Sequence, residues 1–172
     1  MADVGAQLAD LRVRVTSPNG ACSAELVGRS QIRLAFSGSF YYRTDERELE
    51  AQAEALCRLL WAARAREVDA IVTRAGGRTV TAEQARSPLD EEYYRRLDRL
   101  VASGRSPDGR IEVTASAGMR QWSVRIEDGT LQAVSEEDFI ASAAQAADAL
   151  IRDQLDQVMQ LKAEVYDPES PR

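Results

Sequence analysis

Ser17-Pro18-Asn19-Gly20 recurs as Ser106-Pro107-Asp108-Gly109 in the second half of the chain. Both tetrapeptides have the chemistry of a tight turn, because proline fixes φ while Asn-Gly and Asp-Gly tolerate positive φ. Each is followed by short runs that alternate apolar and polar residues, and then by a polar residue, Thr44 or Ser135, before a long Ala-rich segment of helical period. The repetition predicts an internal duplication in which each half needs a partner to cover its apolar face.

The duplication extends well beyond the turn. Apolar positions of one strand and of the long helix match between the copies: Ile32 with Trp122, Leu34 with Val124, Phe36 with Ile126, Leu49 with Ile140, Ala53 with Ala144, Leu59 with Leu150 and Leu60 with Ile151. The charges do not match. Residues 1–88 hold 12 Arg against 11 acids, whereas residues 89–172 hold 10 basic residues against 17 acids. The two halves are therefore predicted to share a core but to differ in their outer surfaces.

The composition is that of an ordinary globular protein. With 172 residues, 44% of them hydrophobic and 29% charged, the chain suits one or two compact domains. No apolar run approaches the roughly 20 residues of a membrane span, and the first residues lack the pattern of a secretory signal. We expect a cytoplasmic protein with no membrane partner. Lys162 is the only Lys among 22 basic residues, which indicates GC-rich coding of the actinobacterial kind.

Side chains suited to catalysis are scarce. The chain has no His, which excludes Ser-His-Asp and Cys-His chemistry and removes the commonest metal ligand. Cys22 and Cys57 lack metal-ligand spacing and are predicted to be buried thiols. The acidic clusters at 90–92 and 136–138 stand at predicted helix starts, where the helix dipole explains them. Gly76-Gly77 has no phosphate-loop pattern around it. We expect no enzyme, no cofactor and no metal.

The periodicity predicts an α+β fold of two (α)-β-β-β-α repeats with antiparallel sheets. Expected bounds are 1–75 for the first repeat, 76–88 for the junction, 89–167 for the second repeat and 168–172 for a tail. Expected strands cover 11–15, 21–27, 30–37, 40–43, 110–116, 119–127 and 130–134. Expected helices cover 6–11, Thr44 to about Val68 or Ile71, 89–103 with Gly104 as C-cap, and Ser135 to about Tyr166.

A unit of this layout, with a Ser-Pro-Asp-Gly turn and a long final helix, resembles the YbaB/EbfC family. The resemblance rests on Ser17-Pro18-Asn19-Gly20 with the strands up to Phe36, and on residues 106–138 with Arg125-Ile126-Glu127-Asp128-Gly129. The segment 121–129 is similar to actinobacterial relatives encoded with ESX secretion systems. Family members are small nucleoid-associated DNA-binding homodimers. The resemblance therefore implies that the two copies pair within one chain as a pseudo-dimer.

Six arginines are the candidate nucleic-acid contacts: Arg58, Arg64 and Arg66 on the first long helix, and Arg95, Arg96 and Arg99 on the helix after the junction. If these helices are neighbours, the guanidiniums form a stripe that contacts phosphates without reading bases. Interleaved acids fit a solvated face with i,i+4 ion pairs instead.

Tyr41-Tyr42 and Tyr93-Tyr94 either stack on bases or pack in the protein.

Two functions remain open. One is a non-enzymatic, sequence-nonspecific DNA-binding protein of the YbaB type, which coats or bridges duplex DNA through its phosphates. The other is a protein–protein interaction module, such as a scaffold or chaperone-like accessory of a type VII (ESX) secretion system, that uses exposed helix faces. The acidic second half favours the latter. In both cases we expect a monomeric pseudo-dimer or a homodimer.

Overall fold

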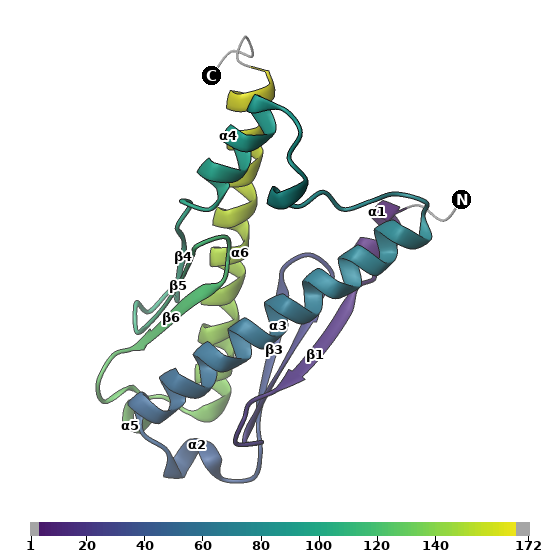
Figure 1. Ribbon diagram of the computed structural model, residues 1–172. Coiled ribbons are helices and arrows are strands. Elements are labelled where there is room, and N and C mark those ends of the chain that lie inside the picture. Colours follow the sequence, from purple (N-terminus) through teal and green to yellow (C-terminus); the bar gives the residue numbers. More distant parts are fainter. Residues whose placement is uncertain (1–3, 168–172) are drawn as a thin grey trace.

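The computed structural model describes residues 4–167, which adopt an α+β fold with two three-stranded antiparallel sheets (Figure 1). The first half contains α1 (Val4–Ala9), β1 (Arg12–Thr16), β2 (Cys22–Val27), β3 (Gln31–Phe36), α2 (Phe40–Arg43) and α3 (Glu46–Arg74). The second half contains η1 (Ala82–Gln84), α4 (Pro88–Leu97), β4 (Ala102–Arg105), β5 (Ile111–Ser116), β6 (Gln121–Ile126), α5 (Thr130–Ala133) and α6 (Glu136–Tyr166). Apart from η1, the same order of elements occurs twice. The predicted tail, 168–172, lies outside the described residues.

The repeated tetrapeptide makes the same turn in both halves, between β1 and β2 and between β4 and β5. The hydroxyl of Ser17 accepts a hydrogen bond from the N–H of Cys22 at 3.0 Å, and Ser106 accepts one from Ile111 at 3.0 Å. The glycine that ends each turn has positive φ, 72° and 75°, which a residue with a side chain rarely adopts. The turn thus sets the strand register twice with identical chemistry.

Two predicted strands are wrong. Residues 40–43 form α2 and residues 130–133 form α5, so the strand that completes each sheet is the one that precedes the tetrapeptide, β1 or β4. Gly38 and Gly129 have φ of 54° and 83°, which turns the chain off the sheet. Tyr41 then lies in the core, 1% exposed, and its hydroxyl donates to the carbonyl of Val134 at 2.9 Å. The aromatic β-propensity of this segment is overridden by tertiary packing.

The predicted helix 89–103 is also too long. α4 ends at Leu97, and Gly104, expected as its C-cap, lies inside β4. The reason is a close approach of β4 to α6, since a Cβ on Gly104 would lie 2.0 Å from the carbonyl oxygen of Ala146. Glycine here allows contact between strand and helix rather than ending a helix.

The helix caps agree with the sequence at Ser135, whose hydroxyl accepts from the N–H of Asp138 at 3.1 Å. At the other long helix the N-cap is Asp45 rather than Thr44. The Asp45 carboxylate accepts from the N–H of Glu48 at 2.8 Å, while Thr44 ends α2. Because Thr44 is the C-cap of α2, α3 begins one residue later than predicted.

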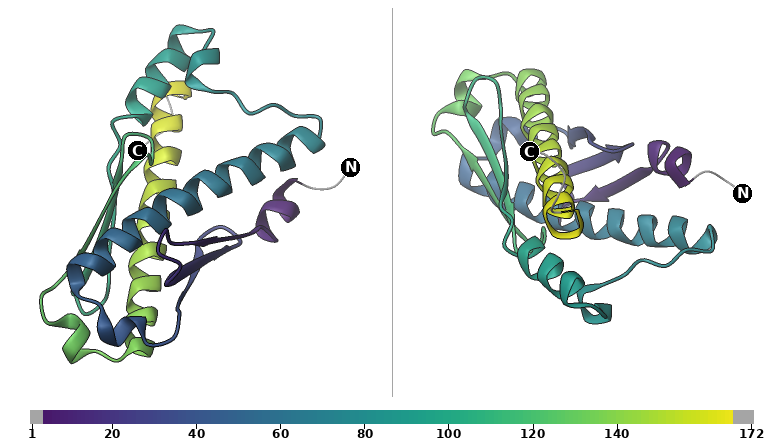
Figure 2. Two further views of the ribbon diagram at one scale, coloured as in Figure 1. Left: turned by 60° about the horizontal axis from the view of Figure 1, so that its bottom comes forward. Right: turned by 90° about the horizontal axis from the view of Figure 1, so that it is seen from above.

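Each long helix packs on its own sheet and also on the other half. α3 contacts β1 and β2 and then β6, while α6 contacts β4 and β5 and then β3. Figure 2 shows the two long helices running at an angle to each other between the sheets. Phe36 and Tyr41 of the first half pack on Phe139 of the second, with ring centroids 6.1 and 5.3 Å apart. One hydrophobic core therefore includes buried residues of both halves.

Three glutamates, four residues apart on α3, hydrogen-bond the outer edge of the other half's sheet. Their Oε1 atoms accept from backbone N–H groups of β6 and α5: Glu54 from Val124 at 3.1 Å, Glu50 from Ile126 at 2.7 Å and Glu46 from Leu131 at 3.1 Å. We call these three residues the carboxylate ladder. The ladder satisfies one donor of α5 and two donors of β6, an edge strand that no other strand within residues 4–167 pairs on this side. On α6 the position that matches Glu50 is Ala141, which has no carboxylate.

Beyond the shared core the molecule divides into two arms (Figure 1). One arm is the end of α6 with α4, where Tyr93 packs with Leu161 and Val165. The other is the end of α3 with α1. Residues 75–87 connect the arms.

We predict that Glu50→Ala destabilises the protein by about 1–3 kcal/mol, because it leaves the N–H of Ile126 without its acceptor. Glu50→Gln, which keeps an oxygen at the same position, should lose much less. Free energies of unfolding from urea titrations measure this. Glu48→Ala, on the exposed side of α3, is the control, and an equal loss in that variant would contradict a role for the ladder.

We predict that Gly104→Ala costs more than about 3 kcal/mol, at the upper end for overpacking, because backbone atoms of α6 occupy the space of the new Cβ. Thermal and urea unfolding measure the loss. Ser103→Ala, on the exposed side of the same strand, should change stability by less than about 0.5 kcal/mol. Retained stability in Gly104→Ala would mean that β4 and α6 separate easily.

Candidate nucleic-acid interface

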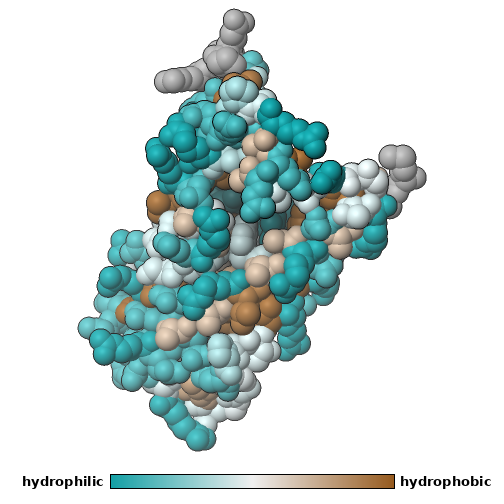
Figure 3. Space-filling model, in the orientation of Figure 1, coloured by the Kyte–Doolittle hydropathy of each residue, from teal (hydrophilic) through white to brown (hydrophobic). Residues whose placement is uncertain are grey.

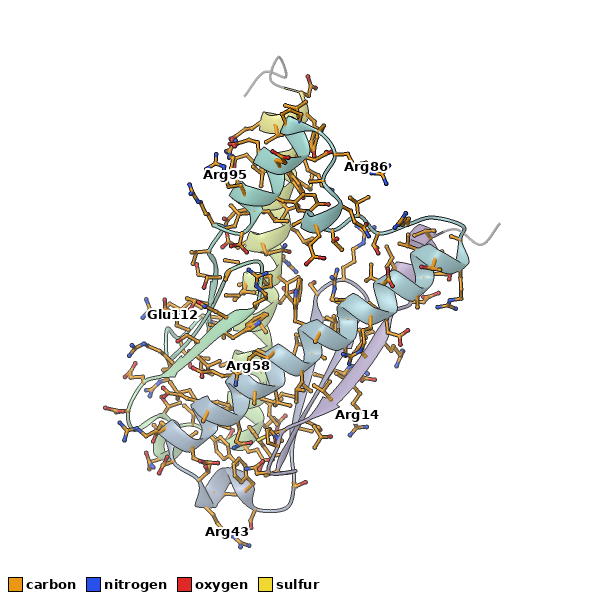
Figure 4. All side chains as sticks on the ribbon, viewed as in Figure 1. Arg14, Arg43, Arg58, Arg86, Arg95 and Glu112 are labelled. Carbon is orange, nitrogen blue, oxygen red and sulfur yellow. The ribbon has the colours of Figure 1, made fainter. Side chains whose placement is uncertain are left out.

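The six arginines expected to form a stripe lie on two separate parts of the molecule. Arg58, Arg64 and Arg66 are on α3, whereas Arg95 and Arg96 are on α4 and Arg99 follows that helix. α4 packs on α6, and Figure 4 shows Arg58 near the middle of α3 and Arg95 on the other arm. The structure therefore gives two groups of three and no single stripe.

Three of the six already have partners within the protein. Arg95 forms an ion pair with Glu92, and Arg96 forms one with Glu164 of α6. The hydrogen bond from Arg95 holds the pKa of Glu92 below its usual value. Arg64 lies over the ring of Trp61, 4.8 Å from its centroid, and burial lowers the pKa of this guanidinium. Arg58, Arg66 and Arg99 are exposed.

The tyrosine pairs are divided between core and surface. Tyr41 and Tyr93 are buried, whereas Tyr42 is 69% exposed. The hydroxyl of Tyr94 donates to the carbonyl of Val80 at 2.8 Å. Neither pair offers two free rings on which successive bases stack, so packing accounts for them.

A more basic surface is the solvent side of the first sheet. Arg12 and Arg14 alternate with buried Val13 along β1, so both point away from the core. Arg14 is paired across the sheet with Glu25, and Glu25 with Arg33 of β3. The three side chains form a row in which the Arg33 guanidinium lies 3.7 Å from the Glu25 carboxylate. One acid thus stands among three exposed arginines.

The second sheet carries a similar row. Arg105 of β4 is paired with Glu112 of β5, which is paired with Arg125 of β6. All three are exposed. Figure 4 shows Arg14 and Glu112 pointing away from the long helices, one on each sheet. Both outer sheet faces therefore present guanidiniums to solvent.

The sheet segments are net positive because they hold few acids, whereas the rest of the chain is net negative. Residues 11–37 hold four arginines and one acid, and residues 102–127 hold four arginines and three acids. All other segments together hold 14 basic residues against 24 acids. The sequence predicted basic stripes on helices alone, so this face was not among the predicted sites. The signal was present in the polar positions of the alternating strands, Arg12, Arg14 and Arg33.

Guanidinium groups on a sheet face suit phosphate recognition, since each presents a planar fork of N–H donors that matches phosphate oxygens.

No cluster of three or more His, Cys, Asp or Glu side chains within residues 4–167 is arranged to hold a metal ion. Figure 3 shows a largely hydrophilic face that is hollowed between the two arms. In the described part of the chain, no helix combines the length and apolarity of a membrane span.

Comparisons with protein-family models, with curated proteins and with solved structures found no match to this chain.

Proposed function

We propose that the protein is a non-enzymatic, cytoplasmic DNA-binding protein of the YbaB/EbfC type, which binds duplex DNA through its phosphates without reading the bases. The observation that carries this proposal is the segregation of charge, which leaves Arg12, Arg14 and Arg33 on one exposed sheet face with only Glu25 among them. Such a protein associates with the nucleoid by sequence-independent contacts.

The spacing of these arginines suits a phosphate backbone. Alternate residues of a strand lie about 7 Å apart, which separates Arg12 from Arg14, and β1 and β3 lie about 10 Å apart across β2. Three cations therefore cover an area that spans neighbouring phosphates of one strand or both. The formal net charge of −6 opposes approach of the rest of the molecule to DNA. Binding is accordingly weak and falls steeply with salt.

We also infer that the two halves form an intramolecular pseudo-dimer. The support is reciprocal packing, in which α3 reaches β6 and α6 reaches β3. A homodimer of single repeats would bury the same surfaces between two chains. A tandem chain buries them within one chain, so the outer sheet faces remain available on both halves.

A second function is favoured by a different feature. A cavity of about 160 Å³ lies in the angle between the arms and includes Trp61, Leu100 and Met119 in its wall. Aromatic and Met side chains in a depression are typical of protein–protein contacts. A protein that binds there, such as a component of a type VII secretion system, leaves the sheet arginines uninvolved.

We predict that fluorescence anisotropy detects binding to unrelated duplexes at low salt, and that Arg12→Gln/Arg14→Gln/Arg33→Gln weakens it strongly. Each lost phosphate contact reduces the slope of log K against log salt by about 0.9, so the triple variant should lower the slope by up to about 3.

The matched control is Arg95→Gln/Arg96→Gln/Arg99→Gln, which removes the same charge from the α4 region. It should weaken binding less than the sheet variant does. Equal losses would show a general charge effect and overturn the assignment to the sheet. If the parent does not bind at low salt, DNA binding itself is wrong, and the cavity between the arms becomes the site to test with protein partners.

We predict that sedimentation equilibrium gives a mass near 19.0 kDa, that of one chain, at micromolar concentration. The reason is that each half already covers the apolar face of the other. A stable species of twice this mass would contradict pairing within one chain. Limited proteolysis of the segment 75–87 provides a second measurement, because the two fragments should remain associated if the shared core holds them.

A further inference from the structure

An apolar cavity of about 110 Å³ lies between the two halves. Both sheets and both long helices contribute to its wall, including Leu34 of β3, Trp61 of α3, Trp122 of β6 and Ala147 of α6. The lining atoms are almost entirely apolar. The cavity is separate from the sheet arginines, which face solvent on the opposite side of the strands.

The cavity results from a difference between the two copies. Leu56 of α3 fills its side of the space and is 3% exposed. In the alignment of the copies, the position on α6 that corresponds to Leu56 is Ala147. Ala143 and Ala144 add two more small side chains on the α6 side. The replacement of Leu56 by Ala147 therefore removes side-chain volume on the α6 side, and neighbouring side chains do not fill this space.

The side of the cavity formed by α6 and β3 is less tightly closed than the side formed by Val124 and Ile126 of β6. Leu34, Ala143 and Ala144 are only half-buried, whereas Val124 and Ile126, on the side of the carboxylate ladder, are buried. The boundary between β3 and α6 therefore offers a short route for a small molecule.

We propose that this cavity binds a small, neutral, apolar molecule of the size of one aromatic ring. An engineered apolar cavity of about 150 Å³ stays dry and binds benzene or xenon, so the volume is of the right order. Water is disfavoured because a bound water needs two or more polar partners, and the wall offers almost none.

The wall of the cavity, including its two cysteines, offers no charged partner to an ionic ligand. Cys22 and Cys57 both line the cavity. Burial raises the pKa of Cys22 to about 11 and that of Cys57 to about 12. Both thiols are neutral at pH 7, so the wall carries no charge to pair with an ionic group, and burying an unpaired ion is costly. Selection is therefore by size and lack of polarity.

The test uses benzene with the full chain. Isothermal titration calorimetry should show saturable binding near one molecule per chain. Trp61 and Trp122 are the only tryptophans and both line the cavity, so iodobenzene should quench their fluorescence in competition with benzene. Iodide is charged and reaches these half-buried rings from solvent, so benzene should not compete with its quenching.

Ala147→Leu should abolish benzene binding, because it places in α6 the side chain that α3 has at the matching position. Ala163→Leu, which adds the same side chain at an exposed position of α6 outside the cavity wall, should leave the affinity unchanged. Absence of saturable binding to the parent, or equal affinity in Ala147→Leu, overturns the proposal.

A measurement on the parent alone covers the case in which Ala147→Leu does not fold. In methyl NMR spectra, benzene should shift Leu34, Leu56 and Val124, which line the cavity. Shifts confined to Leu161 and Val165, in the arm formed with α4, would overturn the site. DNA binding is measured separately, so the outcomes for the two sites are distinguishable.

Discussion

The structure depends on the packing of each long helix against an edge strand of the other half, α6 on β3 and α3 on β6. A three-stranded sheet with one helix leaves apolar surface beside its outer strand, and β3 and β6 both have this position. α6 covers the first and α3 covers the second, so neither half completes its core alone. The carboxylate ladder fixes one of these contacts in register, because Glu50 and Glu54 reach the N–H groups of alternate residues in β6. Spacings of four residues on a helix and two on a strand cover nearly the same length, about 6 and 7 Å.

The two contacts are related but not equivalent. Ala141 replaces the central glutamate of the ladder on α6, and Ala147 replaces Leu56. The α6–β3 boundary is consequently looser, and the apolar cavity lies beside it. In return, α6 approaches its own sheet more closely than α3 does, because Gly104 stands where the first half has Val15. In the second half, Gly104 of β4 thus allows close packing of α6 on its own sheet, while Ala141 and Ala147 of α6 present smaller side chains to the first half.

Much of the architecture could be predicted from the sequence, because it is encoded in local patterns. The turn at Ser17 and Ser106, the alternating strands 111–116 and 121–126, and the cap at Ser135 all follow from neighbouring residues. The errors occur where distant contacts decide. Gly104 looks like a helix cap until α6 is placed against it. The basic face was missed since it appears only when Arg14 and Arg33 are brought to either side of Glu25.

The structural roles of acids on the long helices explain why the sheet segments are net positive. Acids are needed on the long helices for structural reasons: Asp45 caps α3, residues 136–138 occupy the first turn of α6, and Glu46, Glu50 and Glu54 form the ladder. The inner face of each sheet is apolar because it forms the core. Exposed strand positions are therefore the surface on which cations meet the fewest structural acids. A duplicated chain has two such faces, and the first is the more basic because Glu25 is the only acid between residues 11 and 37. Any phosphate-binding activity of this fold is thus favoured on the first half, at a distance from the cavity that the halves share.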